Sequence, residues 1–198
     1  MELLAFNKWS TSGITVEDPG LQKYITLEPR IVPKTGARYA KSRFHKSKVF
    51  IVERLINKLM VPGHRGKKHK ITSGSATGKS ATAYDLVLQT LELIETKVKK
   101  NPIEVLVKAI ENAAPREAIV TIEYGGARYP KAVEMSPQRR IDIALRMMVQ
   151  GSYQKGFNKK KHAAATLANE IINAYEMSNQ SDAISKKVEL ERQADSSR

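Results

Sequence analysis

The segment from Gly74 to Ser80 reads Gly-Ser-Ala-Thr-Gly-Lys-Ser and is the part of the chain closest to a known chemical motif. It is similar to the phosphate-binding loop of nucleotide hydrolases, whose backbone N–H groups surround the phosphates at the start of a helix. That loop has four residues between its glycines and follows an apolar strand. Here three residues separate the glycines, and the polar stretch 69–72 precedes them. We therefore expect no nucleotide and no other cofactor, and a loop that offers amides, hydroxyls and Lys79 to a phosphate backbone.

The histidines and acidic residues do not form a pattern typical of a metal site or of a catalytic pair. His64 and His69 lie five residues apart among basic residues, His45 and His162 are distant, and the chain has no cysteine. Without thiolates or a neighbouring carboxylate, we expect no bound metal. The twenty acidic residues are dispersed, and none is paired in an apolar environment. The sequence therefore predicts a protein that is not an enzyme.

Positive charge is concentrated in one part of the chain. The net charge is +14, and the window from Arg30 to Lys70 holds thirteen Lys or Arg and one acid, Glu53, which makes it +12. Such clustering is typical of a surface that binds a polyanion, although a solvated charged arm would have the same composition. No apolar run of about 18 residues is present, and Met1 to Ser10 lack the apolar core of a signal peptide. We therefore expect no transmembrane helix and no signal peptide, and the excess positive charge would suit nucleic acid, an anionic membrane or an acidic protein as partner.

Aromatic residues are interleaved with the basic ones in two places, 38–46 and 124–131. Lysine and arginine neutralise phosphates, while aromatic faces stack on unpaired bases. In the second place the two glycines of Tyr124-Gly-Gly-Ala-Arg-Tyr129 predict the tip of a hairpin. We expect Arg128, Tyr129 and Lys131 to face nucleic acid there. Two alternatives remain, namely that Tyr124 and Tyr129 form a cross-strand pair, or that the turn is only a soluble surface loop.

Helical periodicity begins near Ser47 and continues to the end of the chain, with one interruption. Apolar stripes predict helices from Ser47 to the stop at Pro62, over 84–98, from Asn101-Pro102 to Pro115, from Ser136-Pro137 to a break flanked by Gly151 and Gly156, after the run 159–161, and from about Ser181. The β-branched run 119–122 and the return 129–135 predict the hairpin, at about 117–135. The fold class expected is mainly α, with about six helices and one protruding β-hairpin between helices three and four.

The first 45 residues lack this periodicity and are broken by prolines and glycines. They are expected to form an extended basic N-terminal arm, ahead of a helical RNA-binding domain over 46–198. Trp9, Tyr24 and Tyr39 would either hold the arm to the body or stack on bases.

Taken in order, five stretches resemble one protein family, the small-subunit ribosomal protein S-seven family. They are Ile56–Met60 leading to Gly66-Lys-Lys68, then Asn101–Asn112, Pro115-Arg-Glu117, Gly125–Tyr129 with Val133–Arg140, and Ala144-Leu-Arg146. The ending from Ser178 to Arg192 and the long arm are similar to the archaeal and eukaryotic branch. Met147 stands where the family often has tryptophan, which keeps the bulk of the side chain.

This resemblance implies a helical fold with a long hairpin and a role as structural constituent of the small ribosomal subunit. It implies binding to the three-prime major domain of the small-subunit ribosomal RNA, nucleation of head assembly, and a position near the exit-site transfer RNA and the messenger RNA. Proteins of the S-nine and S-eleven families would be neighbours, and no homo-oligomer is expected. The resemblance also implies a cytoplasmic location in the small ribosomal subunit and no membrane partner.

Two sets of site residues follow from the charge pattern and the resemblance. The residues expected to bind ribosomal RNA are Arg38, Lys41, Arg43, Lys46, Lys48, Arg65, Lys67, Lys68, Lys70, Lys79, Arg116, Arg139, Arg140, Lys159, Lys160 and Lys161. The residues expected to face transfer RNA or messenger RNA at the hairpin tip are Gly125, Gly126, Arg128, Tyr129 and Lys131.

Two other classes of function share part of this pattern. An RNA-modifying or nucleotide-hydrolysing enzyme is suggested only by Gly78-Lys79-Ser80, where spacing and context are unfavourable. A DNA-binding protein or generic basic adaptor has the same charge and is distinguished by its affinity for duplex DNA.

Overall fold

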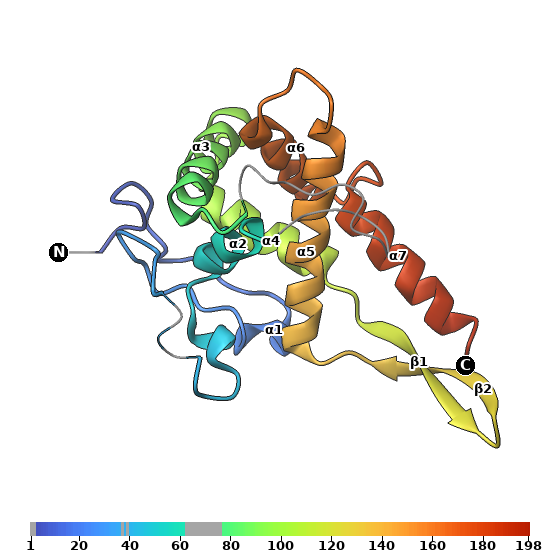
Figure 1. The fold of residues 1–198 in the computed structure, drawn as a ribbon. Helices are drawn as coiled ribbons and strands as arrows, with labels where there is room; N and C mark the ends of the chain where they lie inside the picture. Colours follow the sequence, from blue (N-terminus) through green and yellow to red (C-terminus); the bar gives the residue numbers. More distant parts are fainter. Residues whose placement is uncertain (1–2, 37, 39, 62–76) are drawn as a thin grey trace.

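The structure is a computed structural model that describes residues 3–36, 38, 40–61 and 77–198 (Figure 1). In chain order its elements are α1 (Pro19–Gln22), the short 3-10 helix η1 (His45–Lys48), α2 (Ile51–Leu59), α3 (Ser80–Val98), α4 (Pro102–Ala113), β1 (Glu117–Tyr124), β2 (Ala127–Glu134), α5 (Pro137–Gly156), α6 (Ala163–Tyr175) and α7 (Asp182–Asp195). The described part is thus mainly helical with one hairpin, which confirms the expected fold class. None of its helices is long and apolar enough to span a membrane.

Helix α6 lies at the centre of the bundle and packs against α3, α4 and α5. Its buried face carries Ala164, Leu167, Ala168, Ile171 and Ala174. Small side chains alternate with large ones on this face, so that neighbouring helices approach closely while leucine and isoleucine fill the space between them. The result is a rigid body on which the surface residues are held in fixed positions.

Helix α4 begins where the local sequence predicts. The Asn101 side chain accepts a hydrogen bond from the Ile103 N–H at 3.0 Å, and Pro102 occupies the first turn. An asparagine cap supplies a partner to an N–H group that the helix itself cannot pair, and proline has no N–H to leave unpaired.

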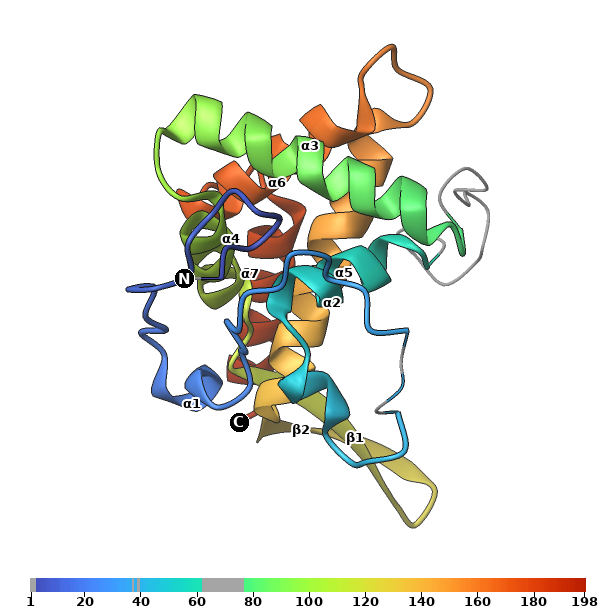
Figure 2. The same ribbon diagram turned by 90° about the vertical axis from the view of Figure 1, so that its left-hand side faces the viewer.

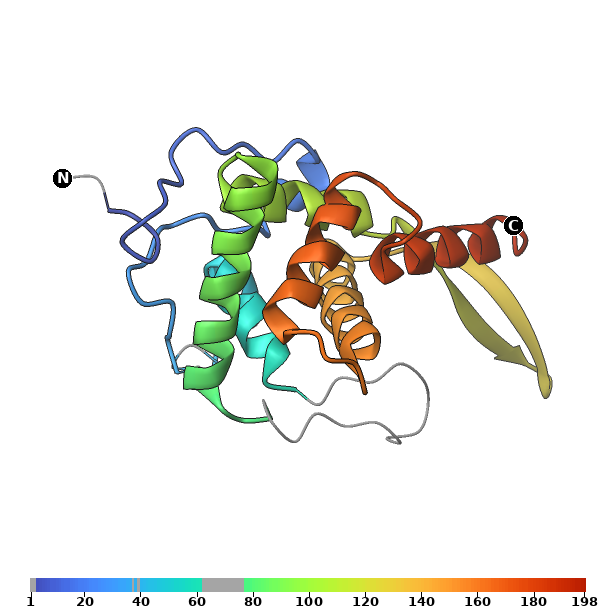
Figure 3. The same ribbon diagram turned by 90° about the horizontal axis from the view of Figure 1, so that it is seen from above.

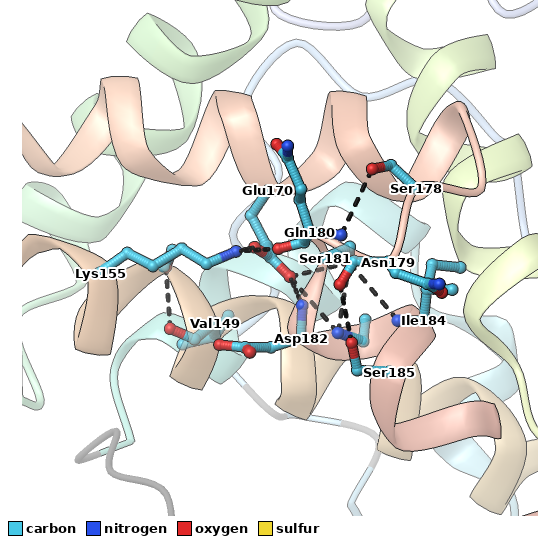
Figure 4. Close-up of polar contacts among 12 residues, drawn as sticks. Val149, Lys155, Glu170, Ser178, Asn179, Gln180, Ser181, Asp182, Ile184 and Ser185 are labelled. Carbon is cyan, nitrogen blue, oxygen red and sulfur yellow. Dashed lines mark hydrogen bonds and ion pairs between the residues drawn. The ribbon is translucent and has the colours of Figure 1, made fainter. Parts of the chain in front are cut away.

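Helix α7 is capped from within its own sequence and from α6 (Figure 4). Ser181 Oγ accepts from the Ala183 N–H at 3.2 Å. The fully buried Glu170 places Oε1 at 2.8 Å from Ser181 Oγ and at 2.7 Å from the Asp182 nitrogen. These contacts fix the start of α7 against α6 because a carboxylate is a strong acceptor for the free N–H groups of a first turn.

Gly151 does not end a helix, contrary to the sequence-based prediction. Helix α5 continues through it to Gly156. A Cβ added at Gly151 would lie 2.7 Å from the Asp182 Cβ, so glycine is needed here for the close approach of α5 and α7. A helix-packing glycine and a helix-breaking glycine are indistinguishable in the sequence alone.

The N-terminal segment packs on the bundle. Ala5, Phe6, Trp9, Leu21 and Ile25 are buried in the same core as the helices. The Trp9 Nε1 donates to a Glu95 carboxylate oxygen on α3 at 3.0 Å, so this tryptophan holds the segment to the body, which is one of the two roles expected for it.

The hairpin has the turn that its glycines predict. Gly125 and Gly126 both have positive φ, 59° and 83°, the conformation of a two-residue turn that matches the twist of the strands. The hairpin projects away from the helical bundle (Figure 1). Both of its strands also contact α7. In the register Ile122 faces Tyr129 and Tyr124 faces Ala127, so the two tyrosines are not directly opposed.

Candidate nucleic-acid interface

Most of the basic residues singled out from the sequence that the structure describes are exposed. Exposed positions before and within η1, at the start of α3, around the hairpin base and in the α5–α6 loop are Arg38, Lys41, Arg43, Lys46, Lys48, Lys79, Arg116, Arg139, Lys159, Lys160 and Lys161. Arg65, Lys67, Lys68 and Lys70 lie outside the described residues. Exposure makes the first set available for contact with phosphates.

Several of these positions gather on one side of the molecule. In Figure 2 the start of α3, the α5–α6 loop, the turn before α2 and the hairpin tip all lie toward the right-hand side. In Figure 3 the start of α3 and the α5–α6 loop lie along the lower side of the view. We call this side the basic face, defined by 40–48, Lys79 and 159–161. This side combines segments from different elements, which is why no single stretch of sequence reveals it.

Lys79 stands at the N-cap position of α3, next to the positive end of that helix dipole. The preceding Gly78 has a φ of 70° and donates its N–H to the Met60 carbonyl at 3.0 Å. The end of the glycine-containing segment is thus tied to the end of α2. The rest of the resemblance to a phosphate-binding loop, at 74–76, falls outside the described residues.

The structure brings together a second group of cations, of which the sequence-based set includes only Lys46. Lys58 on α2 and Arg146 on α5 lie close together, with Lys46 and Asp142 beside them. Burial, followed by the charge of Arg146 and that of Lys46, lowers the pKa of Lys58, and Asp142 opposes the shift only in part. We call Lys46, Arg54, Lys58, Asp142 and Arg146 the α2–α5 basic cluster. Its excess of positive charge is suited to a phosphate group.

The cluster is held in place by Arg54 and Asp142. Asp142 is 3.1 Å from the Arg54 NH2 group and 3.2 Å from the Lys46 Nζ. The buried Arg54 also donates from NH1 to the Tyr24 carbonyl at 3.1 Å. Burial lowers the pKa of Arg54, and the charge and hydrogen bond of Asp142 oppose that shift. A cavity of about 260 Å³ opens beside the cluster, lined by His45, Lys46, Arg54 and Lys58 among others.

One of the basic residues predicted to bind RNA is held by other groups of the protein. Arg140, expected to bind RNA, is 8% exposed, and its guanidinium group is engaged within the protein. Its Nε donates to the Pro115 carbonyl at 3.1 Å, and NH2 is 2.7 Å from Asp18 Oδ2. Burial of Asp18 opposes its ionisation. Two effects outweigh burial, so the Asp18 pKa lies below its usual value. They are the hydrogen bonds donated by Arg140 and the Gly20 N–H, and the positive charges of Arg140 and Arg116. Arg140 therefore joins the N-terminal segment to α5.

The hairpin tip is more aromatic than cationic. Tyr124 is 81% exposed and Tyr129 is 59% exposed. Arg128 faces Glu123 in the register, and its Nε is 3.6 Å from that carboxylate. The strands carry three glutamates against Arg128 and Lys131, so the hairpin itself does not share the positive charge of the basic face. What it offers to a partner is mainly exposed rings, which suit bases more than phosphates.

No group of three or more His, Cys, Asp or Glu that could hold a metal occurs among the residues that the structure describes. In the described part of the chain the arrangement offers cations and aromatic rings for binding.

Comparison with known proteins agrees with this picture. Residues 21–198 match the family described as Ribosomal protein S7p/S5e. The small ribosomal subunit protein uS7 of Nanoarchaeum equitans is 52% identical over 198 residues, which is all of both chains. That of Archaeoglobus fulgidus is 48% identical over 197 residues, covering all of this chain and 96% of the relative. That of Methanosphaera stadtmanae is 46% identical over 195 residues, 98% of each chain.

These matches confirm the resemblance inferred from five short stretches and its archaeal character, and they extend it over the N-terminal segment. The chain belongs to the ribosomal protein S7p/S5e family.

Proposed function

We propose that this chain is a structural, non-enzymatic constituent of the small ribosomal subunit that binds ribosomal RNA through the basic face and the α2–α5 basic cluster. The observation that carries the proposal is the gathering of cations from η1, α2, α3, α5 and the α5–α6 loop on one rigid helical body. The relatives are named as small-subunit proteins and match over 96% or more of their lengths, which supports the same role here.

The physical basis of binding is the release of counterions. Each phosphate that a lysine or arginine neutralises frees condensed cations into solution, which favours binding most at low salt. A helical bundle holds its cations at fixed separations, so it selects an RNA fold in which phosphates stand at matching separations. A protein of this kind stabilises one folded arrangement of an RNA junction and prepares it for later proteins.

The finer part of the proposal concerns the RNA segment and the neighbours. The partner RNA is the three-prime major domain of the small-subunit ribosomal RNA, and binding there nucleates assembly of the head. Proteins of the S-nine and S-eleven families are adjacent. The hairpin tip is proposed to lie at the path of the exit-site transfer RNA and the messenger RNA, and the exposed rings of Tyr124 and Tyr129 support this proposal because they are free to stack on bases.

The test measures affinity for the three-prime major domain as a function of salt concentration. Alanine replacement of Lys159, Lys160 and Lys161 together should weaken binding and reduce the slope of log K against log salt by roughly 2. A matched control replaces Lys97, Lys99 and Lys100, three exposed lysines at the opposite end of α3.

The control should leave both affinity and slope near the wild-type values. Equal effects of the two triple variants would show that only net charge matters and would contradict an interface on the basic face. Equally tight binding of duplex DNA at the same salt concentration would favour a generic basic adaptor instead.

A further inference from the structure

A second cavity adjoins the one beside the α2–α5 basic cluster. It has a volume of about 270 Å³ and is bounded by the segment before η1, by α2 and by the start of α3. Thr35 and Asn57 line both cavities, so the two are neighbours across these residues. The walls of the second cavity are largely apolar and include Pro33, Ile56 and Tyr84.

One charged side chain lines this second cavity and is almost completely buried. Glu53 is 2% exposed, and its Oε1 accepts from the Thr35 N–H at 2.8 Å and from the Thr35 hydroxyl. Its Oε2 is buried and has no hydrogen-bond partner among the residues that the structure describes. A buried acceptor without a donor is costly, and the cost is larger for a charged group. A group bound in the cavity could supply the hydrogen-bond donor that Glu53 Oε2 lacks.

The surroundings favour a nucleobase as that group. A base is flat and presents apolar faces to walls such as Pro33 and Tyr84, while its edge carries N–H donors. Guanine suits an acceptor with two free lone pairs best, because N1–H and the N2 amino group stand side by side on one edge. A lysine or arginine side chain of a protein partner is less suited to this cavity. Lys34 lines it and Lys79 precedes Ser80, another lining residue, so these lysines would repel an incoming cation.

We propose that the two cavities form one site for an unpaired guanosine of the RNA, with the base against Glu53 and its phosphate in the α2–α5 basic cluster. This inference rests on the proposed function, because it assigns a specific contact within the same RNA interface. It makes Glu53, the only acid between Arg30 and Lys70, a recognition residue in a region that otherwise binds phosphates.

The experiment compares guanosine, inosine and adenosine 5′-monophosphates as probes of the full-length protein, by NMR titration at low salt. All three carry the same phosphate, so the basic cluster contributes equally to each. Inosine lacks the N2 amino group, and adenine lacks both donors of guanine's edge. Wild-type protein should bind the guanosine probe about tenfold or more tightly than the adenosine probe, with inosine between them.

Two variants test the base-binding part and the phosphate-binding part of the site separately. Glu53→Gln keeps a carbonyl oxygen for Thr35 but replaces the free oxygen with a donor, so the preference for guanine should disappear. Lys58→Ala should weaken all three probes equally and leave the preference intact. Glu104→Gln, an exposed change of the same charge on α4, should alter nothing. Thermal unfolding of each variant checks that the fold is retained.

Equal binding of the three probes by the wild-type protein overturns the inference, and this comparison needs no variant. Binding of L-argininamide at these residues in place of the guanosine probe also overturns it, since the occupant would then be a protein side chain. If the ribosomal RNA domain still binds in either case, the proposed function stands and only the guanosine site fails. If the wild-type protein does not bind that RNA domain at all, the proposed function itself is contradicted.

Discussion

Lys155 on α5 and Glu170 on α6 form an ion pair of 2.5 Å in which the lysine is partly exposed and the glutamate is fully buried (Figure 4). The Lys155 Nζ contacts Oε2, while Oε1 accepts the hydrogen bonds from the start of α7. One carboxylate therefore joins three helices. The two residues should contribute unequally to stability. Loss of the lysine leaves a carboxylate that still has protein donors, whereas loss of the glutamate leaves several donors unpaired.

Glu170→Ala should lower the free energy of unfolding by about 3 kcal/mol, the magnitude typical when one partner of a buried ionic network is removed. Lys155→Ala should cost clearly less, because the lysine is partly solvated. Urea denaturation followed by circular dichroism measures both. Glu176→Ala, an exposed glutamate just after α6, is the control and should change stability little. Equal losses for the Lys155 and Glu170 variants would contradict the asymmetry.

Gly151→Ala should destabilise the protein by about 1–3 kcal/mol, the usual cost of overpacking. The added Cβ would lie 2.7 Å from the Asp182 Cβ, so α5 and α7 must move apart. Gly156→Ala is a matched control in the same helix, since its nearest neighbour would be at 3.6 Å, an ordinary contact. That control should be neutral or slightly stabilising. A Gly151 variant as stable as the Gly156 variant would show that the close approach of the helices is not required.

Acid should weaken the contact between Asp18 and Arg140. The pKa of Asp18 is below its ordinary value of 3.8 because Arg140 and the Gly20 N–H stabilise the carboxylate against the effect of burial. A lowered pKa in the folded state means that the stabilisation is fully present above 3.8 and is lost as the pH falls through the folded value. Asp18→Asn should therefore reduce the loss of stability on acidification below about pH 4, and Asp85→Asn, an exposed control on α3, should not. Unfolding in urea between pH 6 and pH 2 tests this. Identical pH profiles for Asp18→Asn and the wild type would contradict it.

The parts of the fold that the sequence predicts well are those that local chemistry determines. Asn101 and Pro102 start a helix because of the groups they offer or lack within one turn. Gly125 and Gly126 make the hairpin turn because two adjacent residues need positive φ. Neither conclusion depends on what packs against these residues, so both could be reached without a structure.

The site is harder to predict because burial depends on residues far away in the chain. Arg140 looks like any other basic residue until the N-terminal segment brings Asp18 to it, 122 residues away in sequence. Lys58 is one of many lysines in the sequence, and its spacing of four from Arg54 shows only that both lie on one side of α2. Only the packing of α2 against α5 shows that Arg146 and Asp142 meet them.

Deleting Gly125–Pro130 tests the role proposed for the hairpin tip. The residues removed are all exposed, and the bundle core lies elsewhere, so folding and affinity for the three-prime major domain should remain close to wild type. Subunits that carry the deletion should retain exit-site transfer RNA less well and shift reading frame more often, because the exposed ring of Tyr129 is lost and that of Tyr124 is displaced. Transfer RNA retention by purified ribosomes and a frameshift reporter in cells measure the two effects. Replacing Gly125-Gly126 with Asn-Gly is the control, since that pair adopts the same turn and keeps both tyrosines in register. A deletion that assembles and translates like this control would remove the function assigned to the tip and leave the hairpin as a surface loop.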